Sequence, residues 1–82
     1  MSNDDLLARI TADPHIFGGK PIVRGMRISV EQILSLLAQG ATVDELLQDH
    51  PGLEAADIRA CVAYAHAVIA DDRLEAVNVR AT

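Results

Sequence analysis

Aromatic residues and cysteine are almost absent from the sequence. It has no tryptophan, and Phe17 and Tyr64 are its only aromatic residues. Proteins that bind single-stranded RNA stack its bases on aromatic side chains, so that mode of binding is not expected here. Cys61 is the only cysteine, which excludes a disulfide within the chain and is typical of a reducing compartment.

An excess of positive charge and a long apolar run are lacking as well. The formal net charge is −5, which argues against a general basic surface for nucleic acid or membranes. No apolar run approaches the roughly 20 residues that cross a bilayer. The first five residues, Met-Ser-Asn-Asp-Asp, lack the basic start of a secretory signal. We therefore expect a cytoplasmic protein without membrane contact.

The chain of 82 residues is long enough for a single domain, which we place at 1–82. Its charge is distributed unevenly. Residues 1–29 carry four basic against three acidic residues, whereas residues 30–70 carry six acidic residues against one basic residue. The last segment, 71–82, has three acidic and two basic residues. Any contact with a polyanion is therefore expected from the N-terminal third.

Glycine and proline interrupt residues 10–29. Pro14, Pro21 and the pair Gly18-Gly19 exclude a long helix after the first turn or two of the chain. Short apolar segments at residues 22–23 and 27–28 flank a turn at residues 24–26, which indicates a small hairpin or arm.

Two helices are predicted next, over residues 30–39 and 43–50. Ser29 with Gln32, and Thr42 with Glu45, have the spacing of capping boxes. Gly40 is expected just after the first helix, where positive φ costs a glycine little. A proline and a glycine at positions 51 and 52 end the second helix.

A third, alanine-rich helix is predicted to begin near Leu53 or Glu54 and to extend to about residue 70. Its expected core stripe, with Val68 beside it, consists of Ile58, Cys61, Val62, Ala65 and Ile69.

The order of these elements predicts a mainly α fold. A capped short helix, a break at residues 51–54 and a longer helix have the layout of a helix-turn-helix. We therefore predict a three-helix, helix-turn-helix-like bundle with a short N-terminal β segment or hairpin. A small helical bundle without a nucleic-acid role has the same layout and remains an alternative.

Contacts with DNA, if the chain makes them, are expected mainly from the N-terminal arm. The first turns of the third helix carry Glu54 and Asp57, which a phosphate backbone repels. The alternative for the basic residues of the arm is ion pairing with the acidic helices of the same chain. The predicted DNA-binding residues are Lys20, Arg24 and Arg27 in the arm and Arg59 in the third helix.

The sequence lacks the motifs of nucleotide, metal or nucleophilic sites. The run from Gly18 to Pro21 is shorter than a Walker loop and has no serine or threonine after its lysine. Cys61 and His66 are five residues apart, which does not place them on one helix face for zinc. No serine lies at an elbow or beside a histidine. We expect no enzymatic activity, metal, cofactor or small-molecule substrate.

A set of short motifs runs from Ile10 to Val68. The most specific is Gly18-Gly19-Lys20-Pro21-Ile22-x-Arg24-Gly25-x-Arg27-Ile28, and the others include Ile10-Thr11-x-Asp13-Pro14, Glu45-Leu46-Leu47 and Asp57-Ile58. Together they resemble the DUF433 family, the domain of unknown function 433.

The resemblance implies a trihelical, helix-turn-helix-like domain over residues 10–70, with an extended arm at 10–29, three helices at 30–70 and a tail at 71–82. Many members look like antitoxins of the VapB kind, which are paired with a PIN-like ribonuclease toxin. No enzymatic activity is associated with the family.

The function we expect is that of an antitoxin-like, non-catalytic binding module. It would neutralise a PIN-like nuclease from a neighbouring gene, and it could also repress its own operon by binding operator DNA. The alternative is an adaptor without a DNA-binding role. The small core favours a homodimer. Acidic residues could cover the basic groove of a nuclease, and the predicted partner-binding residues of the tail are Asp71, Asp72 and Glu75.

Overall fold

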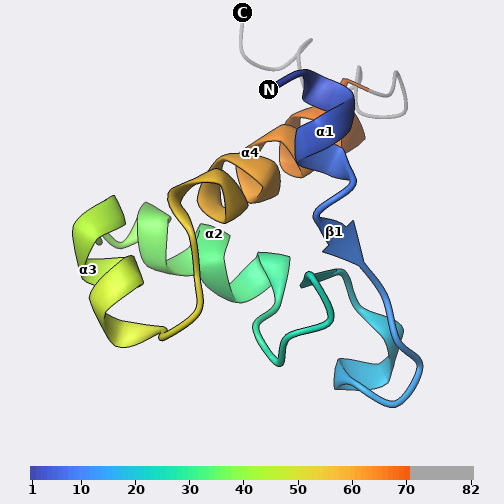
Figure 1. Ribbon diagram of the computed structural model, residues 1–82, viewed down its shortest axis with the longest axis horizontal. Helices are drawn as coiled ribbons and strands as arrows, with labels where there is room; N and C mark the ends of the chain where they lie inside the picture. The colour runs from blue at the N-terminus through green and yellow to red at the C-terminus, as the bar shows by residue number, and fades with distance from the viewer. Residues whose placement is uncertain (71–82) are drawn as a thin grey trace, which may run out of the picture.

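Four α-helices and one pair of short strands form the part of the chain that the computed structural model describes, residues 1–70 (Figure 1). They are α1 (Asn3–Leu7), β1 (Ile10–Thr11), β2 (Ile22–Val23), α2 (Val30–Ala38), α3 (Val43–Asp49) and α4 (Ala55–Ile69), with a 3-10 helix at Phe17–Gly19. The predicted mainly helical fold is confirmed. None of these helices is long and apolar enough to cross a bilayer. The predicted partner-binding residues Asp71, Asp72 and Glu75 lie outside the described residues.

Side chains that the sequence indicated as caps begin α2 and α3. Ser29 Oγ accepts a hydrogen bond from the Gln32 N–H at 3.0 Å, and Thr42 Oγ1 accepts one from the Glu45 N–H at 3.1 Å. The Glu45 carboxylate accepts in return from the Thr42 N–H at 2.8 Å, which completes a capping box. Gly40 follows α2 with a φ of +100°, as expected for a glycine after a helix.

The strand pair joins the N-terminal segment to the arm. Ile10 pairs with Val23 and Thr11 with Ile22, in antiparallel register. Val23 also donates its N–H to the carbonyl of Ile28 at 3.0 Å, so the arm folds back on itself as the hairpin pattern predicted. The pairing of β1 with β2, and the short helix α1 before it, add structure that the predicted three-helix bundle did not contain.

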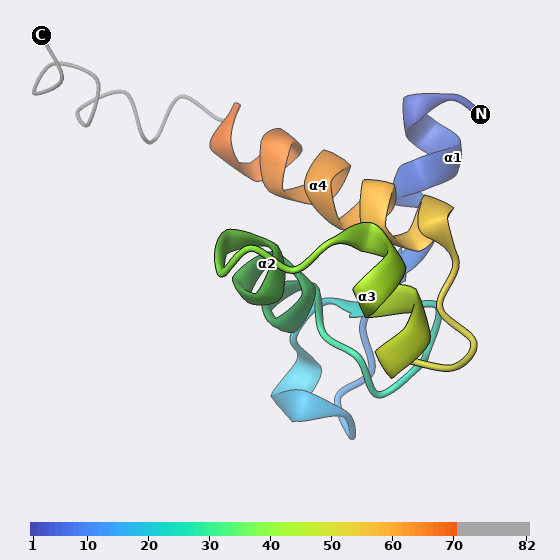
Figure 2. The same cartoon turned by 90° about the vertical axis from the view of Figure 1, so that its left-hand side faces the viewer.

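Helix α4 is the element on which the others pack. It contacts α1 and β1, and it also contacts α2 and α3. Figure 2 shows α1 above α4, and α2 and α3 below it. The beginning of α4 is therefore enclosed by other parts of the chain.

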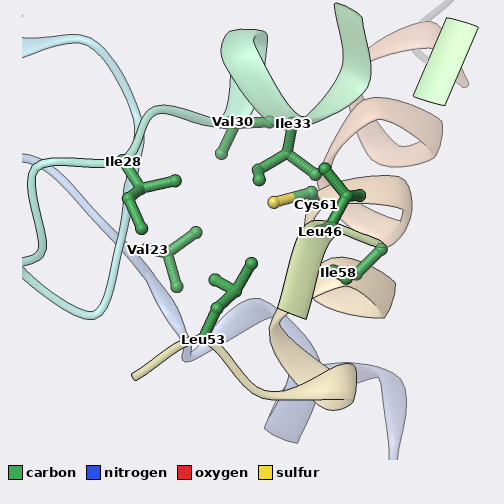
Figure 3. Packing of buried hydrophobic residues seen from close by; sticks show 8 residues of the cluster. All are labelled: Val23, Ile28, Val30, Ile33, Leu46, Leu53, Ile58 and Cys61. Carbon is green, nitrogen blue, oxygen red and sulfur yellow. The ribbon is translucent and has the colours of Figure 1, made fainter. Parts of the chain in front are cut away.

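The hydrophobic core lies between the arm and helices α2, α3 and α4 (Figure 3). Ile33 is 0% exposed and Leu46 is 1% exposed, and complete burial of such a side chain contributes about 1.5–3 kcal/mol. Cys61 belongs to the same cluster, as its position in the sequence predicted. Burial, with a smaller contribution from the Asp57 carboxylate, raises the pKa of this thiol to about 11, so it stays protonated at neutral pH. The other members are Val23, Ile28, Val30, Leu53 and Ile58.

The buried face of α4 differs from the predicted one. Val62 and Ile69, expected in the core stripe, are 50% and 62% exposed. Asp57 and Ala60 are fully buried instead. The reason is that α1 and β1 cover a face of α4 that the sequence pattern did not assign to the core. The prediction for Val62 and Ile69 was therefore wrong, and their side chains belong to the surface.

Candidate functional site

A buried carboxylate lies at the beginning of α4. Asp57 is 0% exposed and accepts hydrogen bonds from two arginines of the N-terminal third. Arg24 binds it with both ends of its fork, Nε to Oδ1 at 2.9 Å and Nη2 to Oδ2 at 2.8 Å. Arg9 Nη1 donates to Asp57 Oδ1 at 2.9 Å and to Glu54 Oε1 at 2.7 Å. We call Arg9, Arg24, Glu54 and Asp57 the Asp57 cluster.

Asp57 also serves as a cap. It is the third residue of α4, and its Oδ2 accepts the N–H of Glu54 at 2.8 Å. Burial alone would raise the pKa of Asp57, but the hydrogen bonds from Arg24, the Glu54 N–H and Arg9 together outweigh burial and lower it. The carboxylate is therefore ionised at neutral pH although no solvent reaches it.

The backbone of Arg24 adopts a strained conformation in this cluster. Its φ is +43°, in the left-handed region that costs a non-glycine residue about 1 kcal/mol. The Arg24 N–H donates to the carbonyl of Arg9 at 2.8 Å, and Arg24 Nη2 donates to the carbonyl of Gly52 at 2.8 Å. These contacts connect the arm to the turn between α3 and α4. Within residues 1–70, no buried polar side-chain atom lacks a hydrogen-bond partner. We conclude that the Asp57 cluster is a structural connection.

The structure places the four predicted DNA-binding residues in different environments. Arg24 is held by Asp57. Lys20 Nζ donates to Glu31 Oε1 at 2.9 Å, but its side chain is 60% exposed, so this ion pair contributes little. Its main effect is that the hydrogen bond from Lys20 lowers the pKa of Glu31. The remaining two residues, Arg27 and Arg59, are exposed.

An apolar groove of about 550 Å³ lies between the first turns of α2 and the last turns of α4. Val68 and Ile69 line it and are 51% and 62% exposed. Lys20 and Glu31 also contribute to its walls, and its apolar lining includes Val30, Leu34, Tyr64 and Ala65. We call it the α2–α4 groove. A groove of this volume can receive several side chains of a partner.

A second, smaller groove of about 420 Å³ lies on another flank of α4. It is lined by residues of α1, α2, α3 and α4, among them Leu6, Leu37 and Val62. Val62 is 50% exposed, nearly the same as Val68 in the α2–α4 groove. The two valines, one in each groove, are therefore a matched pair for substitution.

Sequence reasoning missed the Asp57 cluster. It treated Asp57 as a surface acid and did not assign a role to Arg9. The spacing of Glu54 and Asp57 contained a signal, because an acidic residue at the third position of a helix can accept the N–H of the cap residue. The interpretation that arm cations pair with acids of the same chain describes Lys20 and Arg24, which contact Glu31 and Asp57.

Fold and surface together define a small, mainly helical domain with an exposed apolar groove. The family described as "Protein of unknown function (DUF433)" matches residues 10–65, and the chain belongs to this family. The family resemblance indicated by the sequence motifs is thereby confirmed.

The chain is similar to a protein known from its sequence and to one of known structure. An uncharacterized protein from Sinorhizobium fredii (strain NBRC 101917 / NGR234), y4eO, is 40% identical over 67 residues, or 78% of this chain. The matched region spans only 30% of the length of that relative. A crystal structure of a DUF433 member protein from Anabaena variabilis ATCC 29413 superimposes with a TM-score of 0.69 at 30% identity, and covers 94% of this chain and 71% of that chain.

Proposed function

We propose that this protein is an antitoxin-like, non-catalytic binding module that neutralises a PIN-like nuclease from a neighbouring gene. The observation that carries the proposal is the α2–α4 groove, where apolar side chains from two helices remain exposed. We take this groove as the contact site because its exposed apolar side chains would lose contact with water when a partner covers them. The type of partner follows from the family resemblance and from charge.

Charge complementarity supports a nuclease as the partner. A nuclease presents a basic groove to RNA, and this chain has a formal net charge of −5. Glu31 of α2 lines the apolar groove, and Asp44, Glu45 and Asp49 lie on the neighbouring helix α3. We propose that Asp71, Asp72 and Glu75, which follow α4 in the sequence, add to this negative surface. Apolar contact would then supply affinity, and charge would speed association.

Replacing Val68 with aspartate is expected to prevent neutralisation of the nuclease. A carboxylate in the centre of an apolar contact has to be desolvated without a partner, which should weaken binding at least about 100-fold. The measurement is the affinity for the purified nuclease by titration calorimetry, together with rescue of growth when both proteins are expressed. The matched control is Val62→Asp, which has nearly equal exposure on the same helix and should bind normally.

Other results would change this proposal in defined ways. Loss of binding in Val62→Asp alone would show that the nuclease contacts the second groove. Normal binding by both variants would exclude both grooves as the contact. Failure of the unchanged protein to inhibit the nuclease would contradict the antitoxin function and favour an adaptor without a DNA-binding role.

We also propose that α2, α3 and α4 form a helix-turn-helix-like unit that binds operator DNA weakly through the arm. The Asp57 cluster supports this assignment to the arm, because Arg9 and Arg24 cover the beginning of α4, where a recognition helix would contact bases. Lys20 and Arg27 are exposed on the arm and could contact phosphates.

Arg27→Ala is expected to lower the affinity for operator DNA and to reduce the salt slope by about one unit per lost phosphate contact. Arg59→Ala, the comparison on α4, should change both quantities less. Mobility-shift titrations at several salt concentrations, with and without the partner, measure both. Loss of binding in Arg59→Ala with normal binding in Arg27→Ala would identify α4 as the reading element. Arg24→Ala is a poor probe, because it is also expected to destabilise the fold.

A further inference from the structure

The α2–α4 groove lies next to the point where the described chain ends. Ile69, the last residue of α4, lines the groove, and Ala70 is the last described residue. The segment that follows, 71–82, is therefore attached at one edge of an exposed apolar groove. We propose that residues 71–82 dock into the α2–α4 groove of their own chain when no partner is bound.

The composition of the segment suits this groove. Leu74, Val77 and Val79 supply apolar side chains, and the groove volume of about 550 Å³ is of the size that encloses a small ligand. Asp71 and Asp72 follow Ala70, and aspartate favours turns over helix interiors. The proposed docking requires such a turn.

Charge and tether length are also compatible with docking. Lys20 and Glu31 in the walls of the groove pair with each other at 2.9 Å, so the walls carry no net charge that would repel a segment with three acidic and two basic residues. Twelve residues reach at most about 40 Å when extended, whereas the last two turns of α4 rise only about 10 Å, so the segment can cover the groove.

The tether favours this occupant over a second copy of the chain. A covalently attached segment is present at an effective concentration of about 1 mM, far above that of a separate molecule at micromolar concentration. A partner would then have to displace the segment, which makes the groove selective for ligands that bind more strongly. This inference does not depend on whether the partner is a nuclease.

The test uses the full chain with a spin label on the tail. Asn78→Cys in a Cys61→Ala background gives a single attachment site, because Cys61 is the only natural cysteine. Paramagnetic relaxation enhancement is read at backbone amides in two matched pairs. Leu34 and Ala65 line the α2–α4 groove, and Leu37 and Ala63 line the second groove on the same two helices.

Stronger enhancement at Leu34 and Ala65 than at Leu37 and Ala63 is the expected result. Leu74→Asp combined with Val77→Asp should lower the docked fraction at least about tenfold, since burial of two aliphatic side chains is lost. Ala81→Asp is the control and should leave the enhancement unchanged. The backbone spectrum of each variant reports whether residues 1–70 remain folded.

Two results would overturn the inference. Equal enhancement at both pairs of amides would show that the segment does not select the α2–α4 groove. Enhancement that appears when a spin-labelled chain is mixed with an isotope-labelled, spin-free chain would assign the groove to the tail of a second copy.

Discussion

Replacing Arg24 with alanine is expected to lower the free energy of unfolding by about 1–2 kcal/mol, because Arg24 is partly exposed and Asp57 keeps two other hydrogen-bond donors. The substitution removes the two hydrogen bonds from the guanidinium to Asp57, at 2.9 and 2.8 Å. Arg9 then remains as the nearest cation to a fully buried carboxylate. Because a small domain has roughly 5 kcal/mol of stability in total, such a loss is a large fraction of it. Urea denaturation followed by circular dichroism at pH 7 measures it.

The control for this substitution is Arg27→Ala. Arg27 lies in the same arm and is exposed, so its replacement should change stability by no more than about 0.5 kcal/mol. Combining Arg24→Ala with Asp57→Ala should cost less than the sum of the two single substitutions, because their interaction is lost only once. Equal denaturation midpoints for Arg24→Ala and Arg27→Ala would contradict the role given to the Asp57 cluster.

The helices could be predicted from the sequence because their signals are local. Thr42 and Glu45 are three residues apart, and each supplies the hydrogen bond that the spacing predicts. Gly40 has the positive φ that its place after α2 requires. In these cases the residues that decide the structure are neighbours in the chain, so no tertiary information is needed.

The Asp57 cluster could not be predicted in the same way. Arg24 and Asp57 are 33 positions apart, and Arg9 and Asp57 are 48 positions apart. Their contact depends on the pairing of β1 with β2, which carries Arg9 to the side of the arm. A strand of two residues has no periodicity that a sequence pattern can detect. Asp57, in the polar first turn of the predicted helix, was therefore interpreted as exposed.

The two grooves could not be predicted from the sequence either, although the apolar residues that line them could be identified. A helical stripe shows which residues are apolar but not which of them a neighbouring element covers. Val62 and Val68 both lie on α4 and are nearly equally exposed, yet they line different grooves. The predicted core stripe assigned Val62 to the interior because the sequence did not reveal that α1 and β1 occupy another face of α4.

Acid should remove less of the stability that Asp57 contributes in Arg24→Ala than in the unchanged protein. In the unchanged protein the pKa of Asp57 is lowered below its unfolded value of about 3.9. The unfolded chain then binds more protons than the folded one, so stability from this group is complete above about pH 5 and is lost as the pH falls through the folded pKa. In Arg24→Ala the Asp57 carboxylate stays buried, but the hydrogen bonds from Arg24 that oppose the effect of burial are removed. The pKa of Asp57 is therefore higher in the variant than in the unchanged protein.

The cost of Arg24→Ala is therefore expected to be larger at pH 7 than in acid, because Asp57 is protonated at a higher pH in the variant than in the unchanged protein. Asp5, Glu31 and Glu45 also have lowered pKa values, so both proteins should lose stability in acid. The difference between them isolates Asp57, and urea denaturation of both proteins at pH 7 and at about pH 3.5 measures it. Lys20→Ala, which removes an exposed ion pair, should give only a small difference at either pH. Parallel curves for Arg24→Ala and the unchanged protein would show that Arg24 does not control the ionisation of Asp57.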